Sequence, residues 1–155
     1  MTKVFISYSR KDLHFVQELA SDLEGAGLDV WFDISDLEGG SRWSREIEKA
    51  IHACDHVIMV VSPDSIQSKW VEEEFLLAGE LKKNILPLHY RQSSIPFGYR
   101  SLHFIDIQKS KYSENFHLIL RALGVKDPQR LDDISIAPKK KLKKEKFIIF
   151  CLNKI

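Results

Sequence analysis

The stretch DHVIMVVS, residues 55–62, is a run of apolar and β-branched residues with the length of a strand. Its apolar character is almost continuous, which is typical of a strand buried on both faces, as in a parallel sheet. Similar runs of β-branched and aromatic residues recur along the chain. They lie at residues 3–9, 28–34 and 84–90, with a fifth at 102–107. The sequence therefore predicts a sheet of five short strands.

Segments in which apolar residues recur at helical spacing separate these strands. The first covers residues 13–23, where Ser9 and Asp12 resemble a capping box at its start and Gly25 and Gly27 can terminate it. Three others are expected at residues 47–54, 68–81 and 114–123, the last ending at Gly124. Buried strands that alternate with amphipathic helices predict an α/β fold, a flavodoxin-like doubly wound parallel five-stranded sheet with helices on both faces.

Length and charge limit the class of protein. The chain has 155 residues, 44% of them hydrophobic and 29% charged, which is typical of one soluble globular domain. Its net charge is +1, but residues 139–155 hold seven Lys and one Glu, so the preceding 138 residues carry about −5. An acidic folded part argues against direct nucleic-acid binding.

The cysteines, the N-terminal residues and the apolar run near the C-terminus indicate the cellular compartment. Cys54 and Cys151 form no disulfide framework or metal-binding spacing, which favours a reducing, cytoplasmic location. The N-terminus becomes polar within ten residues and shows no signal peptide. The apolar run FIIFCL, residues 147–152, is too short to span a bilayer, so no transmembrane segment is expected.

Ligands of doubly wound sheets bind beyond the carboxyl ends of the strands. No GxGxxG or GxxxxGK[ST] motif follows any expected strand, so nucleotide binding by a Rossmann fingerprint or a P-loop is not predicted. A phospho-receiver domain has this architecture but needs acidic residues where this chain has Tyr8-Ser9 and Ser62-Pro63. That alternative is rejected.

Helix geometry distinguishes the three consecutive glutamates of SKWVEEEFLLAGE, residues 68–80. If Ser68 caps the helix, an advance of about 100° per residue places Glu74 on the apolar arc and Glu72 and Glu73 outside it. The outer two are explained as solvated acids near the positive end of the helix dipole. A carboxylate on an apolar arc needs a partner cation, a helix edge or a cleft, so Glu74 is the candidate functional acid. Trp70, one turn earlier, is its neighbour in such a cleft or part of the core.

Four fragments in order, VFISYSRKD, GLDVWFDISDLEGGSRWSREIEKAI, CDHVIMVVSPDSIQSKWVEEEF and NILPL, resemble a Toll/interleukin-1 receptor (TIR) domain of the bacterial type. The resemblance covers roughly residues 3–125 and implies a TIR domain over residues 1–126. DISDLEGGSRW, residues 33–43, resembles the BB loop of the family. Residues 127–155 have the composition of a basic linker, which could lead to a fused or separate sensor module.

The resemblance implies an activity and a catalytic residue. Many bacterial and plant TIR domains cleave NAD at the nicotinamide–ribose bond, and they carry Glu four residues after a Trp at the start of this helix. Trp70 and Glu74 have that spacing, so Glu74 is expected to be catalytic. NAD+ is then the substrate and no cofactor is implied. The product is ADP-ribose or a cyclic ADP-ribose isomer, and the sequence does not choose between them.

Other residues are expected to bind the nucleotide. Arg10 could meet the pyrophosphate or could be a surface arginine, and Trp43 departs by one position from the family's aromatic residue, with Arg42 beside it. Asp33 ends a strand and could equally cap a turn. The complete expected substrate-binding set is Tyr8, Ser9, Arg10, Glu38, Trp43 and Trp70.

A metal site is not predicted, and one alternative function remains. His52 and His56 flank Cys54, but the helix is expected to end between them, so no metal site is predicted. Many animal TIR domains are non-catalytic adaptors that act through TIR–TIR contacts. The alternative function is therefore an interaction module, whereas the enzyme is expected to self-associate with other TIR domains in immune defence or virulence.

Overall fold

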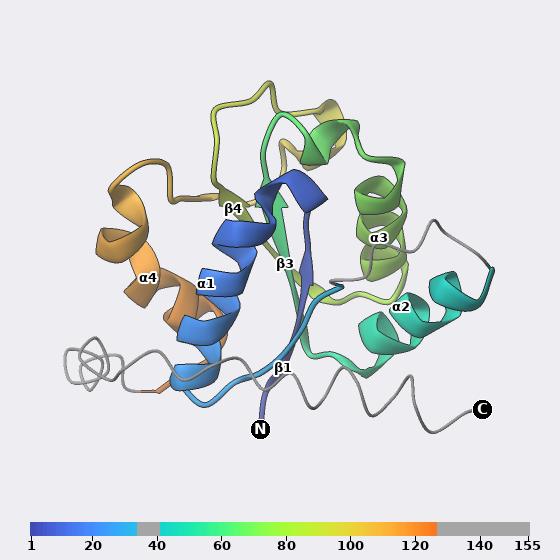
Figure 1. The fold of residues 1–155 in the computed structure, drawn as a ribbon, viewed down its shortest axis with the longest axis horizontal. Helices are drawn as coiled ribbons and strands as arrows, with labels where there is room; N and C mark the ends of the chain where they lie inside the picture. Colours follow the sequence, from blue (N-terminus) through green and yellow to red (C-terminus); the bar gives the residue numbers. More distant parts are fainter. Residues whose placement is uncertain (34–40, 127–155) are drawn as a thin grey trace.

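One sheet of five parallel strands forms the centre of the molecule, in the order β2-β1-β3-β4-β5 (Figure 1). The computed structural model describes residues 1–33 and 41–126. The strands are β1 Lys3–Ser7, β2 Asp29–Trp31, β3 His56–Val61, β4 Asn84–His89 and β5 Ile105–Asp106. All five predicted strands are confirmed, each one shorter than the apolar run that predicted it.

The strand order reverses at β1, which lies between β2 and β3. β1 pairs with β2 from Lys3 opposite Asp29, and with β3 from Val4 opposite His56. This is the flavodoxin-like order, in which the crevice beyond the carboxyl ends of β1 and β3 is the usual ligand site. The predicted fold class is confirmed, and the topology directs attention to the residues that follow Ile6.

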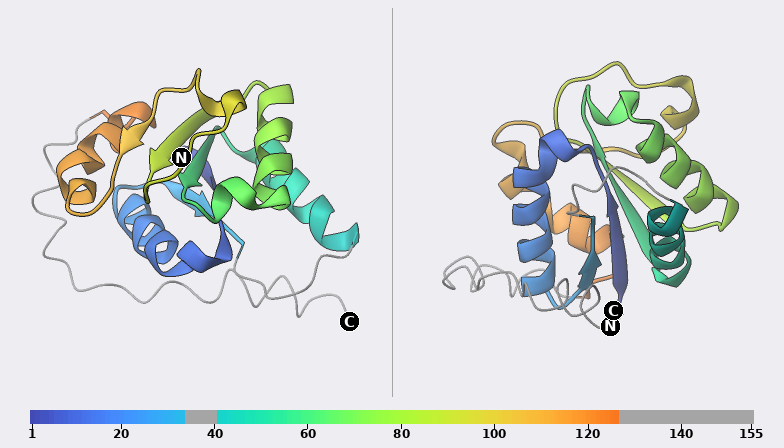
Figure 2. Two further views of the ribbon diagram at one scale, coloured as in Figure 1. Left: turned by 90° about the horizontal axis from the view of Figure 1, so that it is seen from above. Right: turned by 45° about the vertical axis from the view of Figure 1, so that its right-hand side comes forward.

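Helices cover both faces of the sheet (Figure 2). α1 and α4 lie on one face and α2 and α3 on the other, as the views agree. The helices are α1 Leu13–Gly25, α2 Ser41–Ala53, α3 Lys69–Glu80 and α4 Lys111–Ala122, with short 3-10 turns η1 Arg10–Asp12, η2 Ser65–Gln67 and η3 Phe97–Tyr99. No helix in the described part of the chain is both long and apolar enough to cross a membrane.

Alternation along β1 sends its side chains to opposite faces. Val4 and Ile6 belong to the cluster that packs against α1 and α4. Phe5 belongs to a second cluster with Ile47 and Ile51 of α2. The same alternation places Ser7, the last residue of β1, on the α2 and α3 face, where it is 2% exposed.

Helices α1 and α3 begin where the sequence analysis expects them, but only α3 has the predicted cap. The Ser68 hydroxyl accepts a hydrogen bond from the Val71 amide at 3.4 Å, so Ser68 caps α3 as predicted. Ser9 precedes the 3-10 turn η1 instead of α1, and neither Ser9 nor Asp12 makes a side-chain cap. The predicted capping box is therefore wrong. The buried Asp12 carboxylate instead accepts hydrogen bonds from Ser62 and Arg91, which are distant in sequence.

The two histidines beside Cys54 lie on different elements. His52 is on α2, and His56 is on β3 with its Nδ1 2.9 Å from Asn84 Nδ2. Within residues 1–33 and 41–126, no group of three or more His, Cys, Asp or Glu side chains is arranged to hold a metal ion.

Candidate active site

The three consecutive glutamates of α3 differ in exposure as the helix geometry predicted. Val71 is 1% exposed and faces the sheet, whereas Glu72 and Glu73 are exposed to solvent. Glu74 is partly buried, because it lies on the side of α3 that turns toward α2 and β1. The sequence therefore identified the one glutamate of the three that faces the interior.

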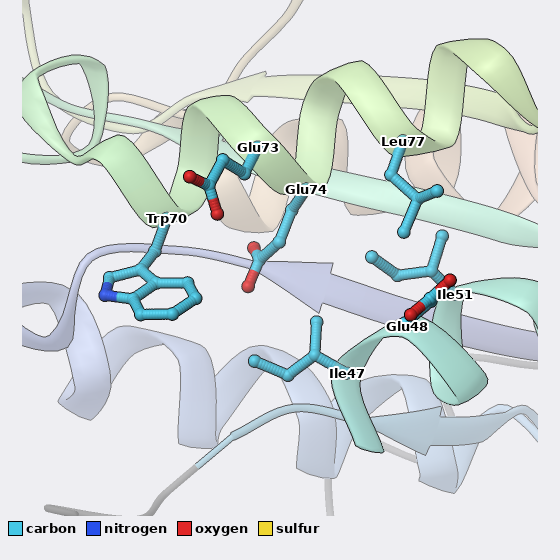
Figure 3. A pocket seen from close by; sticks show the side chains of 7 residues that line it. All are labelled: Ile47, Glu48, Ile51, Trp70, Glu73, Glu74 and Leu77. Carbon is cyan, nitrogen blue, oxygen red and sulfur yellow. The ribbon is translucent and has the colours of Figure 1, made fainter. Parts of the chain in front are cut away.

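A cavity of about 170 Å³ lies between α2 and α3, and Glu74 is in its wall (Figure 3). The Glu74 carboxylate points away from the α3 backbone toward Ile47 of α2, beside the Trp70 ring. Trp70 is 46% exposed, which fits the expectation that it lies beside Glu74 in a cleft better than the alternative that it belongs to the core. The cavity is lined by Ile47, Glu48, Ile51, Trp70, Glu73, Glu74 and Leu77.

Ser7 is the direct hydrogen-bond partner of Glu74. Its hydroxyl donates to Glu74 Oε2 from the end of β1. The sequence analysis did not single out Ser7. A signal was present, because Phe5 and Ser7 share the strand face opposite Val4 and Ile6, and a polar residue on that buried face calls for a partner.

Burial dominates the electrostatics of Glu74. Loss of hydration raises the pKa of its carboxyl from 4.5 to about 7, and the negative charges of Asp33 and Glu73 add to the increase. The hydrogen bond from Ser7 acts in the opposite direction, because it stabilises the charged form. Among the described residues the structure records no cation paired with Glu74. A carboxyl with a pKa near neutrality in a cavity wall is typical of a functional site.

The segment after β1 lies close to the end of β2. The Tyr8 hydroxyl donates to the backbone oxygen of Asp33, and Arg10 Nη2 is 3.8 Å from Asp33 Oδ2. Burial raises the pKa of Tyr8, and the charges of Asp33 and Glu74 raise it further while Arg10 lowers it. Tyr8 and Asp33 are therefore within electrostatic range of Glu74, and Arg10 lies beside Asp33. The backbone oxygen of Ser9 accepts from the Asp12 amide at 2.8 Å in η1.

The structure does not bring every predicted residue into the site. Glu38 lies outside the described residues. Trp43 belongs to the first turn of α2, but its side chain is not among those described. The roles expected for Glu38 and Trp43 stay predictions. Of the other expected residues, Glu74 and Trp70 line the cavity, and Tyr8 and Arg10 meet at Asp33.

Comparison with known proteins agrees with the fold and the residue pattern. A family model described as the TIR domain matches residues 4–120, so the chain belongs to the TIR domain family. The TIR domain of the Toll-related receptor TRR-2 from Hydra magnipapillata is similar in structure, with a TM-score of 0.68 at 24% identity. That similarity covers 78% of this chain and 97% of the receptor domain and supports the fold.

Two relatives are similar to this chain at the sequence level. The NAD(+) hydrolase PdTIR of Paracoccus denitrificans is 32% identical over 95 residues, which make up 58% of this chain. The 2' cyclic ADP-D-ribose synthase BtTIR of Bacteroides thetaiotaomicron is 29% identical over 92 residues, which make up 56% of this chain. In both cases the matched segment is 32% of the relative's own length. The similarity thus spans about a third of each of these larger proteins.

Proposed function

We propose that this chain cleaves NAD+ at the nicotinamide–ribose bond and that Glu74 is its catalytic group. Similarity to proteins named NAD(+) hydrolase and 2' cyclic ADP-D-ribose synthase supports this activity. The observation that carries the proposal is the position of Glu74, a partly buried carboxylate beside Trp70 in the wall of a cavity. No cofactor enters the scheme, because NAD+ is the substrate.

The chemistry of this bond suits a single carboxylate. Nicotinamide is attached to ribose as a cationic pyridinium and departs as a neutral molecule, so the general acid of ordinary glycosidases is not required. As the bond breaks, positive charge moves to the ribosyl carbon and its ring oxygen. An ionised carboxylate fixed nearby stabilises that charge, and the buried setting of Glu74 strengthens the interaction.

The cavity also fits the departing group. Ile47, Ile51 and Leu77 offer an apolar surface, and the Trp70 ring can contact a flat cationic heterocycle. Glu48 and Glu73 add negative charge at the same cavity. In this arrangement the pyridinium occupies the cavity between α2 and α3.

The anionic part of the substrate needs a different environment. Three acidic side chains line the cavity, so the pyrophosphate must lie away from them. We place it toward Arg10, which is half exposed beyond the end of β1. Tyr8 and Ser9 are adjacent in the chain, and Glu38 and Trp43 are proposed to contact the remaining part of the nucleotide.

The deciding experiment measures nicotinamide release. The purified 155-residue chain, at high concentration and with a crowding agent, is incubated with NAD+, and the products are separated by chromatography. Glu74→Gln is expected to reduce turnover at least about 100-fold. Glu72→Gln is the matched control, because Glu72 is an exposed acid on the same helix. Turnover that survives Glu74→Gln would remove the site assignment, and no turnover in any oligomeric state would favour the non-catalytic interaction module.

Several finer features belong to the same proposal. The chromatogram distinguishes ADP-ribose, formed by water, from a cyclic isomer, formed by a nucleophile of the same nucleotide. Self-association is proposed to activate the enzyme, as a concentration dependence of specific activity would show. A sensor module, a cytoplasmic location and a role in defence or virulence complete the proposed context, and residues 1–126 are proposed to be the catalytic TIR domain.

A further inference from the structure

The hydroxyl of Ser7 is enclosed between the sheet and α3. Ser7 is the last residue of β1 and lies in register with Met59 of β3. Met59 packs in one cluster with Val71 of α3, so α3 covers this part of the sheet. Ser7 is 2% exposed, and its hydroxyl donates to Glu74 Oε2. A hydroxyl in such surroundings cannot exchange freely between protein and water partners.

The hydrogen bond acts on one of the two carboxylate oxygens. Donation to Oε2 restricts rotation of the carboxylate about its terminal bond, which is otherwise a soft torsion. Oε1 is then the oxygen that is not held by Ser7. A group fixed through one oxygen keeps the other in a constant place relative to a bound substrate, and small displacements of catalytic groups are costly.

The charged side chains that line the cavity with Glu74, together with Asp33, oppose the ionisation of Glu74. Glu73 is its neighbour on α3, Glu48 reaches the cavity from α2, and Asp33 lies at the end of β2. Each is an acid, so each disfavours a further negative charge. Trp70 and the apolar wall provide no compensating charge. Among the described groups that shift the pKa of Glu74, the hydrogen bond from Ser7 is the one that lowers it.

We propose that Ser7 is a positioning residue for Glu74, holding Oε2 so that the carboxylate is ionised and Oε1 is presented to the cavity. The catalytic part of this inference rests on the proposed function, whereas the hydrogen bond and its effect on ionisation do not. Ser7 acts through Glu74 and does not itself contact the substrate.

Removing the hydroxyl has a distinctive consequence. Hydrogen bonds to charged groups are strong enough that Ser7→Ala should raise the titration midpoint of Glu74 by about one pH unit or more. At pH 7 fewer molecules then carry the ionised carboxylate, so kcat/KM is expected to fall about fivefold for a shift of one unit and further for a larger one. The loss should shrink as the pH rises toward 9, and KM should change little. A purely structural role would not produce this recovery at high pH.

The test uses the full chain with ¹³C-labelled glutamate and follows the carboxyl resonance of Glu74 by NMR from pH 5 to 9. Glu74→Gln assigns the resonance by its disappearance. Ser62→Ala is the matched control, because Ser62 is 0% exposed and its hydroxyl donates to Asp12 instead of Glu74. Ser7→Cys is the second variant, since a thiol of nearly the same size is a weaker donor and should give an intermediate midpoint even if Ser7→Ala does not fold.

The outcomes separate the two levels of the proposal. A higher midpoint in the Ser7 variants and an unchanged one in Ser62→Ala support the inference, and the pH-dependent loss of kcat/KM extends it to catalysis. An unchanged or lower midpoint in both Ser7 variants overturns it, whatever the enzyme does. If the wild-type chain shows no turnover but the midpoint moves as expected, the proposed function fails while the role of Ser7 in ionising Glu74 stands.

Discussion

Glu74 should destabilise the folded chain at neutral and alkaline pH. Its pKa is about 7 in the folded protein and 4.5 without the effects of the fold, so between these values the folded state holds the proton more strongly. Stability is therefore highest below pH 4.5 as far as this group is concerned, and it is lost as the pH rises through 7. Glu74→Gln, which needs no ionisation, is expected to stabilise the protein by about 3 kcal/mol at pH 8.

Urea unfolding at pH 8 and pH 5 measures this effect. The gain from Glu74→Gln should be large at pH 8 and small at pH 5, where the native carboxyl is already protonated. Glu73→Gln serves as control, because Glu73 is exposed and its removal should change stability by less than about 0.5 kcal/mol at either pH. A Glu74→Gln variant that is less stable at pH 8 would contradict the raised pKa. If Glu74→Gln is more stable than the wild type but has lost turnover, the ionised Glu74 carboxylate serves function at the expense of stability.

The same titration predicts the pH dependence of NAD+ cleavage. The proposed chemistry needs the ionised carboxylate, and the pKa of Glu74 is about 7. The rate at substrate concentrations well below KM, which reports the pKa of the free enzyme, should therefore rise about tenfold per pH unit below 7 and level off above it. Initial rates from pH 5 to 9 test this, with NAD+ stability controlled at each pH. A rate that falls as the pH rises through 7 would instead require the protonated carboxyl.

At the scale of the elements, three helices end in the same way. In each, the two amides that follow the C-cap residue bond back to the carbonyls of the last turn, as in a Schellman motif. The residue just after the C-cap has positive φ in all three: Gly27 after α1 at 88°, Lys82 after α3 at 52° and Gly124 after α4 at 78°. Only Lys82 carries a side chain there, which the left-handed conformation disfavours.

Lys82→Gly is therefore expected to stabilise the chain by about 0.5–1 kcal/mol. The glycine removes the steric cost of the left-handed conformation and leaves the backbone bonds from residues 82 and 83 in place. Lys82→Ala is the control, because it removes the long side chain but keeps Cβ, so no gain should follow. The free energy of unfolding in urea distinguishes the two variants. Equal stability of the glycine and alanine variants would show that φ at this position is not the cause.

The helix ends and the site show what a sequence can predict. Gly27, Gly124 and the Ser68 cap are local signals, and each marks a helix end in the structure. Lys82 gives no such signal, because lysine does not favour the left-handed conformation that the end of α3 requires at this position. Ser9 with Asp12 matches a capping box, but Asp12 is used by partners 50 and 79 residues away. Local patterns therefore fail where tertiary contacts compete for the same side chain.

In the candidate site too, the local feature was predicted and the tertiary contact was not. Helix periodicity singled out Glu74, because the side of α3 on which a residue lies depends only on its position within that helix. The partner of Glu74 was not predicted, because Ser7 is 67 residues away and meets it only through the packing of α3 against β1. The contact between Ser7 and Glu74 can be predicted only when the position of Ser7 on β1 and the packing of α3 are both known.

At the scale of the whole molecule, one polar network joins the carboxyl ends of three strands. The Asp12 carboxylate, at the start of α1 after β1, is 4% exposed and accepts from Ser62, which follows β3. Arg91, which follows β4, donates to Asp12 Oδ1 through Nε at 3.1 Å and Nη2 at 2.8 Å and also pairs with Asp64. The network fixes the edge of the sheet on which the candidate site is built, so its loss should affect the entire fold.

Arg91→Met is expected to lower the free energy of unfolding by about 3 kcal/mol, because it leaves the buried Asp12 without its cation. Adding Asp12→Asn should restore a substantial part of the loss, since the amide needs no countercharge and can still bond Ser62. Arg100→Met is the matched control, because Arg100 is exposed and outside this network. Urea unfolding at pH 7 of the wild type, the single Asp12→Asn and Arg91→Met variants and the double variant gives the coupling between residues 12 and 91. If the double variant is as unstable as the sum of its single changes, the buried charge is not what Arg91 neutralises, and the network stabilises the sheet edge by packing alone.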